Sequence, residues 1–127
     1  MPRNISFALT KEQIRNRTKT VTRRLNWLTL KPGDILNACE KCQGIKPGES
    51  IVRICQIRVV SVRREPLRAM SDDVKYGFAE VFKEGFGEHK TLRWPSVWTE
   101  WFANMHNTRA KPCTLETVVT RIEFAYV

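Results

Sequence analysis

The sequence has no long apolar run. Its uninterrupted apolar stretches are only a few residues long, whereas a membrane-spanning helix needs about 20 apolar residues. Repeats of solenoid length, linkers and low-complexity segments are also missing, which excludes solenoid and collagen-like architectures. The sequence contains no glycine-rich phosphate loop, nucleophile elbow or HExxH motif. These absences exclude membrane-spanning proteins and the enzyme classes that such motifs mark.

Acidic residues are scarce relative to basic ones. Among the 127 residues, 22 are lysine or arginine and 13 are aspartate or glutamate, so the formal net charge is +9. This excess favours a polyanionic partner such as RNA, DNA or a nucleotide; the alternative is a scattered charge that serves solubility. Hydrophobic residues make up 42% of the chain, enough for a folded core and too many for a disordered chain. We expect one domain over residues 1–127 and no membrane contact.

Cysteine is limited to four residues, and the first residues contain no apolar segment of the secretory type. We therefore expect a cytoplasmic protein with reduced thiols. Cys39 and Cys42 form a CxxC motif without the βαβ context of a redox pair. Zinc ligation by this pair with Cys55 and Cys113 or His106 stays open, although the spacing matches no standard zinc finger. Incidental or buried thiols are the favoured interpretation, and we expect neither a metal nor a cofactor.

Hydrophobic periodicity predicts strands over residues 5–9, 20–24, 35–39, 51–62 and 118–126, and helices over about 10–17, 71–83 and 95–105. Two Lys-Pro-Gly segments, at 31–33 and 46–48, are typical of type II turns. No helix separates the strands between 35 and 62, which argues against a doubly wound fold. We expect a small α+β fold, an antiparallel or mixed β-barrel with helices around its rim, in which the two terminal strands meet to close the barrel.

Residues 17–24 (RTKTVTRR) place cations and hydroxyls on an extended segment, which suits contacts with phosphates and base edges. The alternative is a solvated basic strand edge. A second basic set lies near the end of the long strand and in the turns, and could add a phosphate track. It consists of Arg58, Arg63, Arg64, Arg68, Lys31, Lys41 and Lys46. For stacking an unpaired base, Trp27, Tyr76 or Phe78 are candidates, with core packing as the alternative for each.

Five segments in this order resemble the ASCH family of PUA-like β-barrels. They are residues 18–24 (TKTVTRR), 30–34 (LKPGD), 57–62 (IRVVSV), 84–86 (EGF) and 120–124 (TRIEF). The resemblance spans nearly the whole chain and is nearest to the short stand-alone ASCH proteins of phages and bacteria. It implies a PUA-like barrel that binds RNA. Residues 77–106 are longer and richer in tryptophan than the compact members, which indicates a helical insertion.

One branch of this family hydrolyses acetylcytidine, and another small member is described as a ribonuclease. In the amidohydrolase branch a Lys-Thr-x-Thr segment supplies a lysine and a threonine, and a later glutamate completes the site. The resemblance thus assigns these roles to Lys19, Thr22 and Glu84, with Glu80 as the alternative carboxylate. Among these residues, the threonine hydroxyl needs a base, and a lysine can be that base when burial and nearby arginines lower its pKa. A glutamate in contact would act in the opposite direction.

The sequence therefore supports an RNA- or nucleotide-binding protein with a basic cleft near residues 17–24 and 58–64. The expected contacts are Arg17, Arg23, Arg24, Lys31, Lys41, Arg63 and Arg64. The first alternative is a metal-independent hydrolase, an amidohydrolase of a modified pyrimidine nucleoside or a ribonuclease. The second is a phage-type effector that presents the tryptophan-rich helix at 94–105 to a protein partner. As the alternative to a catalytic role, Lys19 only binds phosphate, Thr22 is a strand residue and Glu84 ends a helix.

Overall fold

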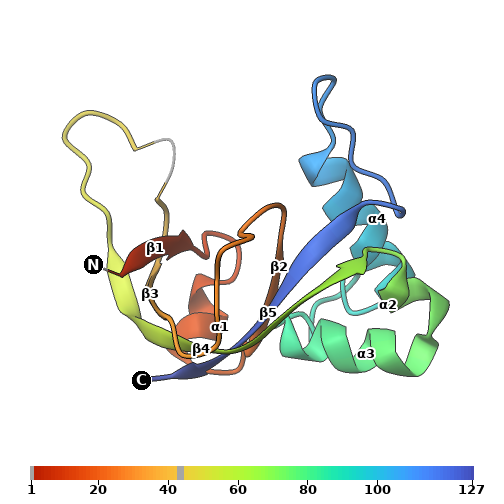
Figure 1. Ribbon diagram of the computed structural model, residues 1–127, viewed down its shortest axis with the longest axis horizontal. Coiled ribbons are helices and arrows are strands. Elements are labelled where there is room, and N and C mark those ends of the chain that lie inside the picture. Colours follow the sequence, from red (N-terminus) through yellow and green to blue (C-terminus); the bar gives the residue numbers. More distant parts are fainter. Residues whose placement is uncertain (1, 43–44) are drawn as a thin grey trace.

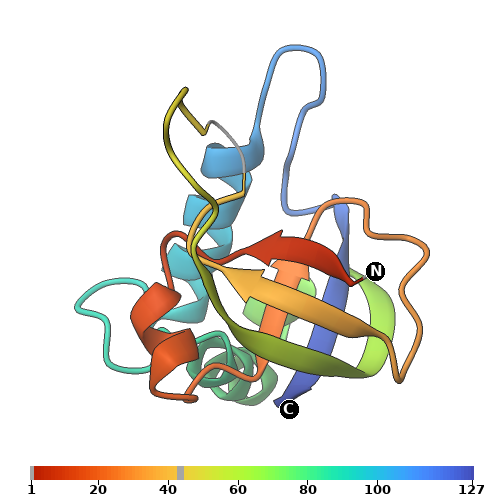
Figure 2. The same ribbon diagram turned by 90° about the vertical axis from the view of Figure 1, so that its left-hand side faces the viewer.

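A computed structural model describes residues 2–42 and 45–127. Its five strands form one mixed sheet in the order β1-β3-β4-β5-β2, which curves into a half-barrel (Figures 1 and 2). The elements are β1 (Arg3–Ser6), α1 (Lys11–Arg15), β2 (Val21–Arg24), β3 (Ile35–Cys39), β4 (Arg53–Pro66), α2 (Ala69–Asp72), α3 (Val74–Lys83), α4 (Pro95–His106) and β5 (Val118–Tyr126). The predicted α+β class is confirmed.

The long strand β4 links the sheet to the helices. Its first half pairs with β3 and its second half with β5, so it crosses the whole molecule. The register shifts between Val59 and Ser61, which marks a bulge that bends the strand. Val59 is buried on one side of this bulge, whereas the next residue, Val60, is 48% exposed. Because of the bend, the far end of β4 leads into the helical half of the molecule.

The prediction that the terminal strands meet is wrong. β5 forms antiparallel ladders with β4 along one edge and with β2 along the other, so both of its edges are occupied. β1 pairs instead with β3, in parallel. β1 and β2 are therefore the two edges of the sheet, and the barrel stays open between them (Figure 2). Residues of β1, β2 and α4 line a common cavity at this opening.

The first strand and helix are shorter than predicted. β1 ends at Ser6, because the last sheet hydrogen bond in this segment runs from the amide of Phe7 to the carbonyl of Cys39 (2.8 Å), and a turn follows. Leu9, which alternation placed in the strand, is 64% exposed. α1 ends at Arg15, and Arg17 lies in the left-handed region with φ of 63°. A left-handed residue of this kind terminates a helix.

The helices pack at the end of the sheet where β4 finishes. The predicted helix at 71–83 is two helices, because the backbone of Asp73 is extended between α2 and α3. Its carboxylate accepts a hydrogen bond from the amide of Tyr76 (3.1 Å) and caps α3. α4 begins at Pro95 as predicted. No helix in the described part of the chain is long and apolar enough to cross a membrane.

Two hydrophobic cores result. The first lies inside the curved sheet and includes Ile5, Phe7, Leu36, Ile57, Ile122 and Phe124. The second joins the helices to the end of the sheet and includes Leu67, Met70, Val81, Phe86, Trp98 and Phe102. Residues from both cores meet at the opening between β1, β2 and α4.

Candidate functional site

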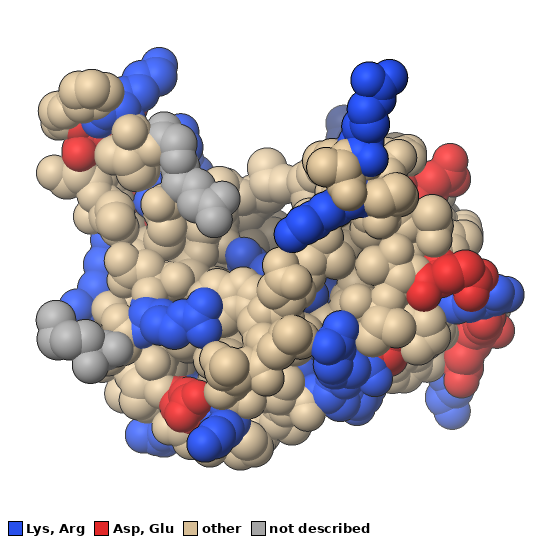
Figure 3. All heavy atoms as spheres, turned by 45° about the horizontal axis from the view of Figure 1, so that its top comes forward, with Lys and Arg blue, Asp and Glu red and all other residues tan. Residues whose placement is uncertain are grey.

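A cavity of about 320 Å³ lies between the two cores. Aromatic side chains form much of its wall, and polar and charged side chains from β2 and from the end of α3 form its floor. The aromatic residues are Phe7, Trp27, Phe86, Trp98, Trp101 and Phe102, with His106 beside them. In Figure 3 this face is hollowed between two projecting loops, and basic side chains are visible within the hollow. We call this cavity the aromatic pocket.

Lys19 lies at the floor of the aromatic pocket and is 3% exposed. Its Nζ donates to the carbonyl oxygen of Glu84 (2.6 Å) and to Oε1 of the same residue (3.1 Å). The rings of Phe7 and Phe86 flank the amine, with centroids 5.9 and 5.8 Å away. Burial lowers the pKa of Lys19, the Glu84 carboxylate raises it, and Arg24 and Arg23 lower it, with a lowered pKa as the net result.

Backbone contacts bring Glu84 to Lys19 across 65 residues of sequence. The amide of Thr20 donates to the carbonyl of Lys83 (2.9 Å), which joins the start of β2 to the end of α3. Gly85 follows Glu84 with φ of +96°, and a Cβ at this position would lie 3.0 Å from the side chain of Gln13. Glycine is therefore required at this turn, both for its backbone conformation and for its close approach to α1. The segment at 84–86 thus places the carboxylate of Glu84 at the pocket.

Thr22 and Arg24 lie on the pocket side of β2, as residues two apart in a strand do. Nε of Arg24 donates to Oγ1 of Thr22 (3.1 Å), and Nη2 of Arg24 donates to the carbonyl of Ser6 (2.6 Å). Burial lowers the pKa of Arg24 to about 10. Across residues 2–42 and 45–127, Arg24 forms no ion pair with a carboxylate. The pocket therefore holds a cation that a bound anion could neutralise.

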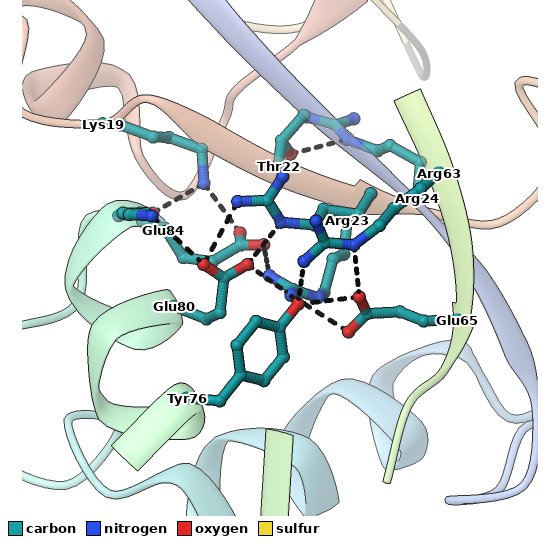
Figure 4. Close-up of polar contacts among 11 residues, drawn as sticks. Lys19, Thr22, Arg23, Arg24, Arg63, Glu65, Tyr76, Glu80 and Glu84 are labelled. Carbon is teal, nitrogen blue, oxygen red and sulfur yellow. Dashed lines mark hydrogen bonds and ion pairs between the residues drawn. The ribbon is translucent and has the colours of Figure 1, made fainter. Parts of the chain in front are cut away.

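Arg23 also lines the pocket, but its guanidinium group lies in a network of ion pairs with carboxylates (Figure 4). Its Nη1 donates to Oε2 of Glu84 (3.0 Å), and its Nη2 donates to Glu80 (2.6 Å) and Glu65 (3.2 Å). Burial lowers the pKa of Arg23, but the three carboxylates more than offset this and raise it. Arg23 is thus buried in protein contacts, although the sequence placed it among residues that bind nucleic acid.

The other predicted contacts are spread over the molecule. Lys41 is exposed next to Cys42, which lines the pocket, and Lys31 is exposed in its Pro-Gly turn. Arg63 joins the network through Glu65 and Tyr76, whereas Arg64 is exposed on the neighbouring position of β4. Arg17 is exposed, with its guanidinium 5.4 Å from the centroid of the Tyr126 ring. Of the predicted nucleic-acid contacts, Arg23 and Arg24 line the pocket.

The three predicted catalytic residues all line the aromatic pocket, and Glu84 is the carboxylate in contact with Lys19. The alternative, Glu80, lies in the network behind it. Hydrogen bonds from Arg121 and Arg23 outweigh burial and lower the pKa of Glu80 to about 2. The sequence thus placed both carboxylates near the site, but only the structure distinguishes their surroundings.

The cysteines are free. Burial and a hydrogen bond with Cys42 raise the pKa of Cys39 to about 11, so its thiol is neutral at physiological pH. Within residues 2–42 and 45–127, no three His, Cys, Asp or Glu residues are arranged to hold a metal ion. The described residues therefore contain no assembled set of ligands for the zinc ion that the sequence left open.

Sequence reasoning misses most of the aromatic wall. It places the tryptophan-rich helix at 94–105 in a helical insertion and offers it to a protein partner, but it names neither Trp98 nor Phe102 as a pocket residue. Of the three stacking candidates, only Trp27 lines the pocket, because Tyr76 belongs to the ion-pair network and Phe78 is 42% exposed on α3. Periodicity identifies the buried face of a helix but does not reveal that this face borders a cavity.

Comparison with known structures agrees with this architecture. The crystal structure of an ASCH domain from Lactobacillus crispatus JV V101 is similar over 98% of this chain and 78% of that chain, with a TM-score of 0.65 and 14% sequence identity. No family model and no curated protein matches the sequence. The structural similarity confirms the expected α+β fold with a barrel-like sheet. The chain therefore has the ASCH fold, a mixed five-stranded half-barrel with helices packed around it.

Proposed function

We propose that the aromatic pocket binds one unpaired base of RNA, or a nucleotide-like ligand of the same chemistry. The observation that carries this proposal is the composition of the cavity, whose aromatic walls stand over a floor with Lys19, Thr22 and Arg24. Its volume of about 320 Å³ falls in the range of small-molecule sites. Proteins recognise single-stranded RNA by stacking splayed bases on aromatic side chains and by hydrogen bonds to base edges. The fold is compatible with this use.

A binding experiment with a matched tryptophan control tests the proposal. Trp101 is half-buried and lines the pocket, whereas Trp94 lies outside it at the start of α4 and is 45% exposed. We expect Trp101→Ala to weaken the binding of a short single-stranded RNA by about tenfold, since one stacked base contributes roughly 1–3 kcal/mol. Trp94→Ala leaves the affinity unchanged. Equal affinities of both variants and the wild type, measured by fluorescence anisotropy, would reject the pocket as the base site.

Hydrolysis is the second candidate, and the contact between Lys19 and Glu84 beside Thr22 favours it. Burial lowers the pKa of Lys19, so its amine accepts a proton more readily near neutral pH than an exposed lysine does. In this mechanism Oγ1 of Thr22 attacks the acyl carbon of an amide and its proton passes to Lys19. The C–N bond then breaks, the departing amine takes that proton, and water hydrolyses the acyl-threonine ester. Arg24, which donates to Oγ1 of Thr22, stabilises the negative charge on that oxygen.

Turnover of acetylcytidine and of labelled RNA, measured in parallel, tests this candidate. We expect Lys19→Ala and Thr22→Val to abolish product formation, and Thr22→Ser to retain part of it because the hydroxyl remains. Lys75→Ala, an exposed lysine on α3, serves as the control. Product from the wild type that persists in Lys19→Ala contradicts the mechanism. If the protein binds acetylcytidine or RNA but forms product from neither, the pocket is a binding site and the hydrolase is rejected.

A further inference from the structure

Three arginines form a row across neighbouring strands at the helical end of the sheet. Arg23 on β2 is paired in register with Arg121 on β5, and Arg121 is paired with Arg63 on β4. Like charges on directly opposite residues destabilise a sheet. Carboxylates from β4 and α3 compensate for this, because Glu65, Glu80 and Glu84 accept hydrogen bonds from the row. Sequence pattern does not indicate this row, since its members are about 40 to 100 residues apart.

Arg23 is the member of the row that reaches the aromatic pocket. Its side chain is fully buried, and one guanidinium group contacts three carboxylates and the hydroxyl of Tyr76 (3.2 Å). The decisive contact is with Glu84, whose two carboxylate oxygens are divided between two cations. Oε2 accepts from Arg23 at 3.0 Å and Oε1 accepts from Lys19 at 3.1 Å (Figure 4). Glu84 therefore bridges the network and the pocket floor.

We propose that Arg23 is a positioning residue that anchors Glu84 and, by sharing its carboxylate with Lys19, favours the neutral form of the Lys19 amine at the pocket floor. The inference rests on the proposed use of Lys19 as a proton acceptor, and it identifies the group that prepares Lys19 for that role. A neutral amine has a lone pair, so it accepts a proton or a hydrogen bond, whereas an ammonium group only donates.

Charge balance around the pocket supports this assignment. The buried cations Lys19, Arg23 and Arg121 face the carboxylates of Glu80 and Glu84, and Glu65 lies at the edge of the network. Arg24 adds a further cation on the pocket side. Cys42 and His106 are the remaining titratable groups of the pocket lining, and the rings of Phe7 and Phe86 flank the amine. Arg23 stays positively charged at all physiological pH values. The Glu84 carboxylate is therefore shared between Arg23 and Lys19 and does not neutralise Lys19 alone.

The sign of the effect follows from the contacts. Arg23 repels the charged form of Lys19 and competes for Glu84, so both effects favour the neutral amine. When the charge of Arg23 is removed, the Glu84 carboxylate interacts with Lys19 alone and stabilises the charged amine, so the pKa of Lys19 rises. At neutral pH the protonated fraction of Lys19 then increases, and any step that needs the free amine slows. Each unit of upward shift corresponds to a tenfold loss of the neutral form below the pKa.

The direct test is a titration of Lys19 in the absence of any substrate. In protein labelled with ¹³C at the lysine side chain, the Lys19 resonance is assigned with Lys19→Arg and followed from pH 5 to pH 11. We expect Arg23→Gln to move the Lys19 transition to higher pH, and Arg23→Lys, which keeps the charge, to restore most of the wild-type value. Arg121→Gln is the matched control, because Arg121 contacts Glu80 but not Glu84. A Lys19 transition that Arg23→Gln leaves unchanged would overturn the proposal.

Removal of one buried cation leaves carboxylates unpaired and can prevent folding. The double variant Arg23→Gln/Glu65→Gln removes one cation together with one of its carboxylates, and is titrated in place of Arg23→Gln if that variant does not fold. With acetylcytidine, the acid limb of the pH–rate profile moves to higher pH in the same variant, with a loss of about tenfold or more at pH 7. A shifted Lys19 titration with no wild-type turnover supports the role of Arg23 and rejects the hydrolase. Wild-type turnover together with an unshifted Lys19 titration supports the hydrolase and rejects the role of Arg23.

Discussion

At Lys19, burial and two neighbouring cations oppose the effect of one carboxylate on the pKa of the amine. Burial and the two neighbouring arginines lower its pKa, while Glu84 raises it, and the amine is held between the Phe7 and Phe86 rings. The sequence correctly predicted that nearby arginines lower the pKa and that a contacting glutamate raises it. Arg17, which belongs to the same basic segment of the sequence, is exposed and packs on Tyr126, and it is not among the causes of the Lys19 shift. The larger cause, burial, belongs to the tertiary structure.

Glu80 gives a prediction about acid stability. Its pKa is lowered to about 2 from an ordinary value of 4.5 by Arg121 and Arg23, against the effect of burial. A depressed pKa in the folded state contributes stability above the unfolded value, and this contribution is lost as the pH falls from about 4.5 to about 2. The shift corresponds to about 3 kcal/mol, to order of magnitude.

We expect Glu80→Gln to lower the free energy of unfolding at pH 7 and to flatten its fall between pH 5 and pH 2. Urea unfolding followed by tryptophan fluorescence measures both quantities. Glu100→Gln on the exposed side of α4 is the control and keeps the wild-type pH dependence. A pH dependence of Glu80→Gln that equals that of the wild type would show that the ion pairs of Glu80 do not stabilise the fold.

Among the elements, α3 matters most for the site, since it carries Glu80 and ends just before Glu84. Its position depends on a close approach to α2 and α4 at Gly77. A Cβ on this residue would lie 1.9 Å from the carbonyl oxygen of Met70 and 2.8 Å from Cβ of Pro95. The backbone atom cannot move aside without displacing α2. Gly77 therefore sets the distance at which α3 packs, and with it the placement of both carboxylates.

Gly77→Ala is expected to destabilise the protein by about 1–3 kcal/mol, because the added methyl group overpacks the contact. Helix propensity alone predicts the opposite sign, a gain of about 1 kcal/mol for replacing glycine within a helix. Chemical unfolding of Gly77→Ala decides between the two signs. Ala79→Gly, at an exposed position of the same helix, provides the comparison, with an expected loss of about 1 kcal/mol. A more stable Gly77→Ala would contradict the observed packing.

Over the whole molecule, basic side chains lie on two loops that project on either side of the pocket (Figures 1 and 3). The loop between β3 and β4 contains Lys41 and Lys46, and the loop between α4 and β5 contains Arg109 and Lys111. The first loop also contains Glu40 and Glu49, and the second contains Glu116 near its end. Each loop adjoins the pocket, since Cys42 and His106 belong to its lining. A single-stranded RNA whose base enters the pocket would have its phosphates between these loops.

The loops give a prediction that separates a polymer from a monomer. We expect Lys41→Gln/Lys46→Gln and Arg109→Gln/Lys111→Gln each to weaken the binding of a single-stranded RNA oligonucleotide. They also reduce the dependence of log affinity on log salt by roughly 0.7 for every phosphate that the variant no longer neutralises. A mononucleotide, which is too short to reach the loops, keeps its affinity. Lys75→Gln/Lys90→Gln is the charge-matched control, and an equal effect in this variant would show that only net charge matters.

Much of the fold follows from local pattern. Period-2 alternation located β3, β4 and β5, and the two Pro-Gly turns lie where predicted, with Gly33 and Gly48 at φ of 96° and 88°. The same pattern extended the first strand to Leu9, because alternation continues into a turn that local sequence does not mark. It also predicted closure by the terminal strands, because the sequence does not reveal that β5 has a partner on both edges. Strand pairing depends on long-range contacts.

Local sequence is sufficient to locate the strand that carries Thr22 next to Lys19, the turn that presents Glu84, and the excess of positive charge. These properties depend on residues close together in the chain, where spacing, turn chemistry and composition act directly. Three other properties emerge on folding: Lys19 contacts Glu84, Arg23 is buried among carboxylates, and α4 lines a cavity. Each of these requires two separate cores to pack against each other, and no short segment encodes that packing. Local sequence specifies the parts of the pocket, and long-range packing brings them together.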